Sequence, residues 1–95
     1  MGKIALITGA TSGIGEACAR KFAEGGFDLI LTARSADKLE AIKIELEKEG
    51  TKVKTLVFDV RDADAAKNAL DSLEAEWQTI DVLINNAGLA LGLEK

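Results

Sequence analysis

Three glycines, Gly9, Gly13 and Gly15, stand close together in the segment ITGATSGIG, residues 7–15, directly after a short apolar run. Glycine allows the positive φ angles of a tight turn and lets a ligand approach the backbone closely. A helix that starts here leaves its first backbone N–H groups unpaired, and its dipole adds partial positive charge. Phosphate and pyrophosphate groups bind at such helix starts. The candidate phosphate-binding residues are Gly9, Ala10, Thr11, Ser12, Gly13, Ile14 and Gly15.

The glycine spacing is G-x-x-x-G-x-G, which differs from the dinucleotide fingerprint G-x-G-x-x-G. Two interpretations therefore remain: a phosphate-binding loop, or a glycine-rich turn that only lets the following helix pack on a sheet. The apolar run before the loop and the helical spacing after it favour the phosphate site.

The end of the next apolar run indicates which dinucleotide is preferred. In dinucleotide-binding folds, an acidic residue about 20 positions after the glycines binds the ribose 2′-hydroxyl of NAD. Here the segment LTARS, residues 31–35, places Ala33 and Arg34 at that point and contains no acid. A guanidinium in place of a carboxylate favours a 2′-phosphate, and therefore NADP(H). Ser35 could add a hydroxyl donor and Lys38 a positive charge; the alternative is that Arg34 is a solvated surface residue.

Apolar runs and helical periodicity alternate along the chain and predict the elements that position these residues. Strands are expected at 3–8, 27–32, 52–58 and 80–85, each separated from the next by a helix. Alternating strands and helices imply parallel strands with right-handed connections. We therefore predict an α/β fold, a Rossmann-like parallel sheet with strand order 3-2-1-4, which is half of a doubly wound fold. Residues 1–95 would form a single dinucleotide-binding domain that stops just after the fourth strand, where such a fold normally continues.

The helices are predicted from caps and from apolar residues that share one face. The first begins at Ile14 and ends at the glycine pair 25–26; the second is capped by Ser35 or Asp37 and ends at Gly50; the third is capped by Asp62. The expected apolar faces comprise Ile14, Ala17, Cys18 and Phe22 in the first helix, Leu39, Ile42 and Leu46 in the second, and Ala66, Ala69, Leu70, Leu73 and Trp77 in the third.

Composition excludes several classes of function. The net charge of -4 argues against non-specific binding to nucleic acid, and no apolar run is long enough to span a bilayer. One cysteine, Cys18, cannot form an intrachain disulfide, so we expect a reducing cytoplasm and an inert core thiol. No partner in the form of a membrane or a nucleic acid, and no metal site, is expected.

Three motifs at the expected strand ends resemble those of the short-chain dehydrogenase/reductase family: TGATSGIG at 8–15, DV at 59–60 and NNAG at 85–88. The segments AEW, 75–77, and IDVLINNAGLALG, 80–92, are most similar to the branch that oxidises serine and other 3-hydroxy acids. The resemblance implies that Asp59 accepts a hydrogen bond from the adenine amino group and that the backbone N–H of Val60 donates one to the adenine ring. The alternative is that Asp59 is a turn or cap residue. The resemblance also implies that Asn85, Asn86, Ala87 and Gly88 contact the adenosine ribose or stabilise the sheet.

The residues that transfer hydride in this family, a Y-x-x-x-K pair with a serine and an asparagine, have no counterpart in this chain. It contains neither tyrosine nor histidine. We therefore expect the NADP-binding N-terminal portion of an oxidoreductase that acts on an alcohol or carbonyl substrate, without catalytic residues of its own. The alternative is a non-catalytic nucleotide-binding or self-assembling module. We also expect a homo-oligomer, with self-association through an exposed fourth strand.

Overall fold

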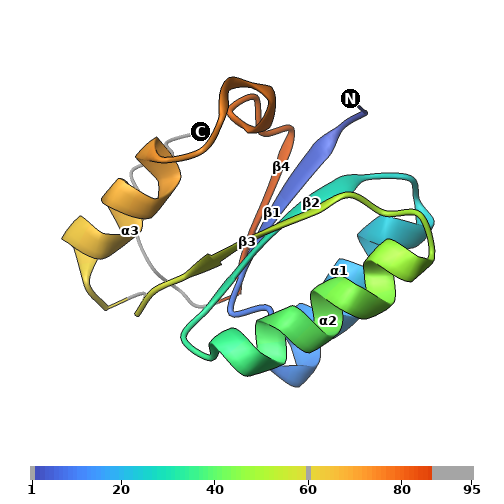
Figure 1. Ribbon diagram of the computed structural model, residues 1–95, viewed down its shortest axis with the longest axis horizontal. Helices are drawn as coiled ribbons and strands as arrows, with labels where there is room; N and C mark the ends of the chain where they lie inside the picture. Colours follow the sequence, from blue (N-terminus) through green and yellow to red (C-terminus); the bar gives the residue numbers. More distant parts are fainter. Residues whose placement is uncertain (1, 60, 87–95) are drawn as a thin grey trace.

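Four parallel strands form one sheet in the order β3-β2-β1-β4 within the residues that the structure, a computed structural model, describes: 2–59 and 61–86 (Figure 1). The predicted strand order is confirmed. The elements are β1 (Ile4–Thr8), α1 (Gly13–Glu24), β2 (Asp28–Ala33), α2 (Ala36–Lys48), β3 (Val53–Val57), α3 (Ala63–Asp71), the 3₁₀ helix η1 (Ala75–Trp77) and β4 (Val82–Asn85). Each observed strand lies within two residues of the range expected from the sequence.

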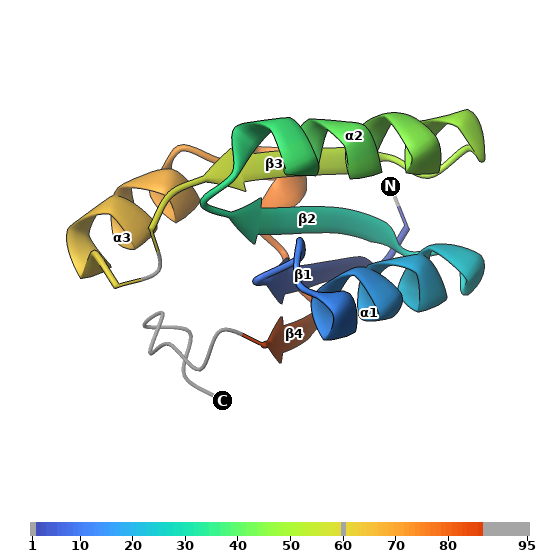
Figure 2. The same ribbon diagram turned by 90° about the horizontal axis from the view of Figure 1, so that it is seen from below.

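Helices cover both faces of the sheet, which explains why β1 is apolar along nearly its entire length. Figure 2 shows the strands side by side in the order β3, β2, β1, β4, and Figure 1 shows α1 and α2 on one face of the sheet and α3 on the other. Alternate residues of β1 enter the two layers: Ala5 and Ile7 pack with α1 and α2, whereas Ile4 and Leu6 pack with α3 and η1. All five residues of β1 are buried. A strand enclosed in this way reads as a continuous apolar run.

A side chain caps the start of each of the three α-helices, and the sequence predicts the caps of α2 and α3 but not that of α1. Ser12 Oγ accepts a hydrogen bond of 3.0 Å from the Gly15 N–H, and Asp62 Oδ1 accepts one of 3.0 Å from the Ala65 N–H. Ser35, rather than Asp37, caps α2, and Asp37 instead lies in the first turn of that helix. Each cap satisfies one otherwise unpaired donor and fixes the residue at which its helix begins.

The prediction that one helix runs from Asp62 to Trp77 is wrong. Helix α3 ends at Asp71, where the Ser72 hydroxyl donates a 2.6 Å hydrogen bond to the Ala69 carbonyl and so takes up an acceptor at the helix end. Trp77 belongs to the separate 3₁₀ helix η1, yet it is buried in the same apolar cluster as Ala66 on α3. The apolar spacing therefore identified the residues that pack in this cluster, with Ala69 and Leu70 only partly buried, but not the length of the helix.

The expected apolar face of α1 is wrong at Ile14 and at Ala17, which are both exposed. Ile14 is 71% exposed, and α1 instead presents Gly15 and Ala19, both buried, to the sheet. Cys18 and Phe22 are half-buried against the same cluster, as expected. Two small residues let the helix lie close to the sheet, and this rotates Ile14 outward.

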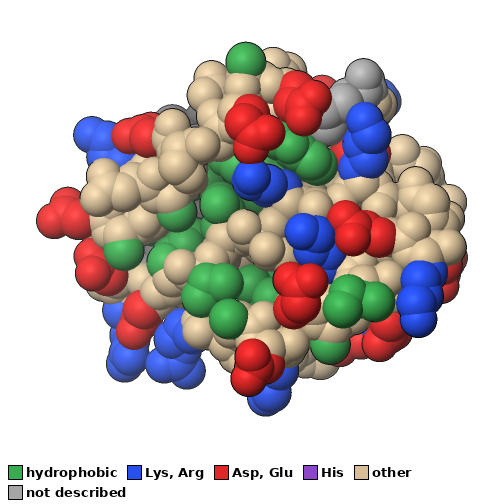
Figure 3. All heavy atoms as spheres, viewed as in Figure 1, with side chains coloured by type: hydrophobic (Ala, Val, Ile, Leu, Met, Phe, Trp, Pro, Cys, Tyr) green, Lys and Arg blue, Asp and Glu red, His purple; other side chains and the backbone are tan. Residues whose placement is uncertain are grey.

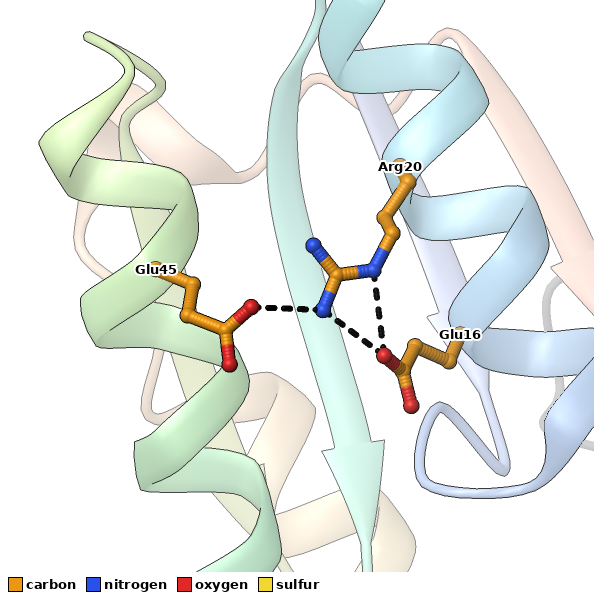
Figure 4. A network of polar contacts seen from close by, with 3 residues as sticks. All are labelled: Glu16, Arg20 and Glu45. Atoms are coloured by element: carbon orange, nitrogen blue, oxygen red, sulfur yellow. Dashed lines mark hydrogen bonds and ion pairs between the residues drawn. The ribbon is translucent and has the colours of Figure 1, made fainter.

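Arg20 links α1 to α2 across the surface (Figure 4). Its Nε and Nη2 donate to Glu16 Oε2 at 3.0 and 2.7 Å, and Nη2 also donates to Glu45 Oε1 on α2 at 2.8 Å. The hydrogen bonds that Arg20 donates to Glu16 and, with a smaller effect, to Glu45 raise the pKa of Arg20 above its ordinary value. The two helices that form one layer are thus joined by a shared guanidinium.

Candidate functional site

A cleft of about 440 Å³ opens where three parallel strands end. It is lined by the loop after β1, the end of β2 and the segment after β3; the lining residues are Gly9, Thr11, Ser12, Ala33, Arg34, Asp59 and Arg61. In open α/β sheets, ligands bind outside the carboxyl ends of the strands, where the strand order reverses. Strand β1 is that point here, because β2 pairs on one side of it and β4 on the other.

A different structural requirement accounts for glycine at each of the three positions of the loop. Gly9 has a φ of 63°, which favours glycine. A Cβ at Gly15 would lie 2.1 Å from the Gly9 carbonyl oxygen, so only glycine allows α1 to pack on the loop. A Cβ at Gly13 would meet nothing within 4 Å in the described residues. Packing therefore does not require glycine at position 13. The empty space where its side chain would lie leaves room for a ligand to approach the backbone.

The Ser12 hydroxyl is fully used in holding the loop together. It donates to the Gly9 carbonyl at 2.9 Å and accepts hydrogen bonds from the Gly15 N–H at 3.0 Å and from Asn86 Nδ2 at 2.7 Å. A hydroxyl has one donor and two acceptor positions, so none is left for a ligand. Ala10 is buried, and its N–H donates to the Thr32 carbonyl on β2 at 3.0 Å.

Backbone N–H groups remain available at the start of α1. Within the described part of the chain, those of Thr11, Gly13 and Ile14 donate to no acceptor. Together with the helix dipole, they give the cleft a donor-rich, partly positive wall. The arrangement suits an anion.

The two asparagines of the NNAG motif fasten β4 to its surroundings. The hydroxyl of the buried Thr8 on β1 donates to Asn85 Oδ1 at 2.9 Å, and Asn86 Nδ2 donates to the Gly9 carbonyl at 3.2 Å as well as to Ser12. Of the two roles considered for these residues, the structure shows sheet and loop stabilisation. Contact with a ribose stays a prediction. The other two residues of the motif, Ala87 and Gly88, lie outside the described residues, as does Val60.

Two guanidinium groups and one carboxylate line the far side of the cleft. Arg61, which sequence reasoning missed, donates through Nε and Nη2 to Asp59 at 3.1 and 2.8 Å, and through its backbone N–H at 2.9 Å. These hydrogen bonds, with a smaller contribution from the charge of Arg34, lower the pKa of Asp59 from 3.8 to about 2. Arg34 itself forms no hydrogen bond or ion pair within the described residues. The sequence signal that could have indicated this ion pair is the segment DVRD, in which an arginine follows two positions after the acid.

Other kinds of site find no support in the part of the chain that is described. Residues 2–59 and 61–86 contain no group of three or more His, Cys, Asp or Glu side chains placed to hold a metal ion. None of their helices is long and apolar enough to cross a membrane. On the face drawn in Figure 3, Lys and Arg side chains are interspersed with Asp and Glu and do not gather into one basic surface.

The parallel sheet, the glycine loop before α1 and the cleft at the strand ends together define a Rossmann-like α/β unit. The model of the short chain dehydrogenase family matches residues 3–94, so the chain belongs to the short-chain dehydrogenase family. The resemblance of its three motifs to that family is confirmed.

Relatives of this chain are oxidoreductases. It is 52% identical over 91 residues to the NADP-dependent 3-hydroxy acid dehydrogenase YdfG of Salmonella typhi, covering 96% of this chain and 36% of that protein. It is 49% identical over 87 residues to the serine 3-dehydrogenase of Agrobacterium fabrum, covering 92% of this chain and 34% of that protein. A metagenomic short-chain oxidoreductase, solved in complex with NADP, superposes with a TM-score of 0.82 at 37% identity, covering 92% and 39% of the two chains. The chain spans about a third of the length of these curated relatives.

Proposed function

We propose that this chain binds NADP(H) in the cleft and forms the cofactor-binding portion of an oxidoreductase that acts on an alcohol or carbonyl, such as a 3-hydroxy acid like serine. One observation carries the proposal: the cleft joins the glycine loop to Arg34, a guanidinium without a partner in the described residues, at the end of β2. The names of the relatives, which include an NADP-dependent 3-hydroxy acid dehydrogenase and a serine 3-dehydrogenase, support it.

The residues present fit such a dinucleotide. The N–H groups of Gly13 and Ile14 would bind the pyrophosphate, which the absence of a side chain at Gly13 admits. Arg34 would pair with the 2′-phosphate, assisted by the Ser35 hydroxyl and the charge of Lys38. When bound, the nicotinamide supplies the hydride acceptor or donor of the reaction.

At the adenine end, Asp59 would accept a hydrogen bond from the amino group, because its carboxylate stays ionised with a pKa of about 2. Three of the roughly four acceptor positions of this carboxylate are filled by Arg61, and one is left on Oδ2. Val60, Asn85, Asn86, Ala87 and Gly88 complete the proposed adenosine site.

Binding and catalysis are separate in this proposal. We assign no catalytic residue within residues 1–95, which contain no tyrosine and no histidine to act as the acid or base of hydride transfer. We expect no turnover of serine or of any other alcohol by these 95 residues alone. Measurable dehydrogenase activity of the purified chain would contradict this part of the proposal.

A self-assembling module is the second candidate function, and the position of β4 favours it. β4 is the outer strand of the described sheet, and its residues Val82, Leu83 and Ile84 are half-buried. An unpaired apolar edge pairs readily with another chain. We propose a homo-oligomeric contact through this strand; sedimentation of a monomer at every concentration would contradict it.

The setting we propose is the cytoplasm, with a small-molecule substrate as the partner. The half-buried Cys18, the one cysteine of the chain, supports a reducing compartment because no intrachain disulfide is possible. The net charge of -4 supports a small-molecule rather than a nucleic-acid partner.

Calorimetric titration of the chain with NADP⁺ and NAD⁺ in identical buffer tests the proposed function. We expect NADP⁺ to bind about tenfold more tightly, as a charge-assisted hydrogen bond predicts. Arg34→Ala should abolish this preference, whereas Lys67→Ala, which removes an exposed charge on α3, should preserve it. Equal affinities of the unmodified chain for both dinucleotides, or an Arg34→Ala variant that keeps the preference, would refute the assignment.

A further inference from the structure

We propose that Arg61 is a specificity-determining residue of the cleft: by pairing with Asp59, it keeps Arg34 free to bind the 2′-phosphate of NADP(H). The inference rests on the proposed function and extends it to a residue that makes no contact with the phosphate in this scheme. Its basis is the arrangement of three charged side chains that line one cavity.

The pairing of Arg61 with Asp59 is close and directional. Asp59 Oδ1 accepts from the backbone N–H and Nε of Arg61 at 2.9 and 3.1 Å, and Oδ2 accepts from Nη2 at 2.8 Å. Two side-chain donors and one backbone donor from the same residue thus contact both oxygens of the carboxylate. A bidentate pair of this kind is more specific in geometry than a contact between point charges.

Arg34 is the second cation among the side chains that line the cavity together with that carboxylate. It lines the same cavity, and its charge also lowers the pKa of Asp59, so the two groups interact through space. Yet Arg34 forms no hydrogen bond or ion pair in the described part of the chain, whereas Arg61 is paired with the acid. Two guanidinium groups thus face one carboxylate, and only one of them is paired.

Removing Arg61 would change this balance. Asp59 would keep its negative charge in the cleft, and Arg34 would become its nearest cationic partner. A ligand's 2′-phosphate would then compete with the Asp59 carboxylate for Arg34. A ligand that has a 2′-hydroxyl in place of the phosphate would not depend on Arg34 and would be little affected.

A double-mutant cycle tests the inference, with the ratio of the NAD⁺ and NADP⁺ dissociation constants as the readout. The four proteins are the unmodified chain, Arg61→Ala, Asp59→Asn and the double variant. The ratio cancels any effect on the adenine and the pyrophosphate, which both ligands share. Arg61 has a 76% exposed side chain, so its removal should leave the fold intact, which circular dichroism would verify; Lys67→Ala is the matched control for loss of an exposed positive charge.

We expect Arg61→Ala to lower the preference for NADP⁺ about two- to fivefold, the range of an exposed ion pair. Asp59→Asn should restore it in the Arg61→Ala background but change it by less than about twofold when Arg61 is present. If Asp59→Asn changes the ratio of dissociation constants by the same factor with and without Arg61, the two residues act independently, and the inference is overturned. An unchanged ratio in Arg61→Ala would also overturn it, while the proposed function would stand. Failure of the unmodified chain to bind either ligand would overturn both.

Discussion

Substitution of Gly13 by alanine should separate binding from stability. Gly13 is the first residue of α1, it does not have a positive φ, and an added Cβ would meet nothing within 4 Å in the described residues. Alanine is the better helix former, so we expect the free energy of unfolding to stay the same or to rise by up to about 1 kcal/mol. The methyl group would occupy the open side through which a phosphate reaches the N–H groups. Loss of one charge-assisted hydrogen bond lowers affinity about ten- to hundredfold.

Gly15→Ala is the matched comparison, because it adds the same methyl group two positions later. Its Cβ would lie 2.1 Å from the oxygen and 2.9 Å from the carbon of the Gly9 carbonyl. The Gly9 carbonyl, which accepts hydrogen bonds from Ser12 and Asn86, cannot move away as a flexible side chain can, so α1 would have to shift from the sheet. We expect a loss of roughly 1–3 kcal/mol or more in the free energy of unfolding, as for overpacked cores.

Urea unfolding and calorimetric titration with NADP⁺ provide the two readouts. Trp77, the one tryptophan of the chain, is buried in the layer formed by α3 and η1, away from both glycines. Its fluorescence therefore reports unfolding without a direct effect of the substitutions. The reasoning is refuted if Gly13→Ala unfolds as readily as Gly15→Ala, or if it binds NADP⁺ as tightly as the unmodified chain.

Three further predictions concern polar groups. Thr32 is fully buried and its hydroxyl has no partner in the described residues, so Thr32→Val should raise the free energy of unfolding by about 1 kcal/mol in urea titrations; a decrease would contradict this. Arg20→Ala should cost about 0.5–1.5 kcal/mol, a loss that shrinks in about 1 M salt because the ion pairs with Glu16 and Glu45 are partly exposed. Asp59, whose pKa falls from 3.8 to about 2, should stabilise the fold fully above pH 3.8 and lose this effect as pH falls through 2. The measurement is the free energy of unfolding of the Asp59→Asn variant and of the unmodified chain, compared between about pH 2 and pH 5. A difference between the two proteins that changes only near neutral pH would contradict the prediction.

The order and type of the elements could be predicted from the sequence because strong local signals agree with the fold. Enclosed strands such as β1 read as apolar runs, and caps such as Ser35 and Asp62 stand at the helix starts. The end of α3 could not be predicted, because the apolar spacing continues to Trp77 although the backbone leaves the helix at Ser72. The apolar spacing reports which residues are buried between α3, η1 and the sheet. It does not report whether these residues belong to one continuous helix.

The candidate site was predictable in its residues but not in their connections. The glycine loop, Arg34 and Asp59 were expected, and the structure brings all three to one cleft. The hydrogen bond from Asn86 to Ser12 was not expected, since it joins positions 74 residues apart. The pairing of Arg61 with Asp59 could not be predicted for a different reason. In the sequence Arg61 looks like any exposed arginine, and only the geometry of its hydrogen bonds to Asp59 distinguishes it.

The pairing of β1 with β4 has a consequence for the order of folding. β1 and β2, like β2 and β3, are joined by one helical crossover, whereas Thr8 meets Asn85 across 77 positions of the chain. Contacts of such long range form late, because loop-closure entropy opposes them until other structure has shortened the effective separation. During synthesis on the ribosome, the glycine loop emerges long before Asn86, which follows β4 and donates hydrogen bonds to Gly9 and Ser12 of the loop. We therefore expect the proposed dinucleotide site to be completed late in folding, so that binding of NADP⁺ would report this step in refolding kinetics.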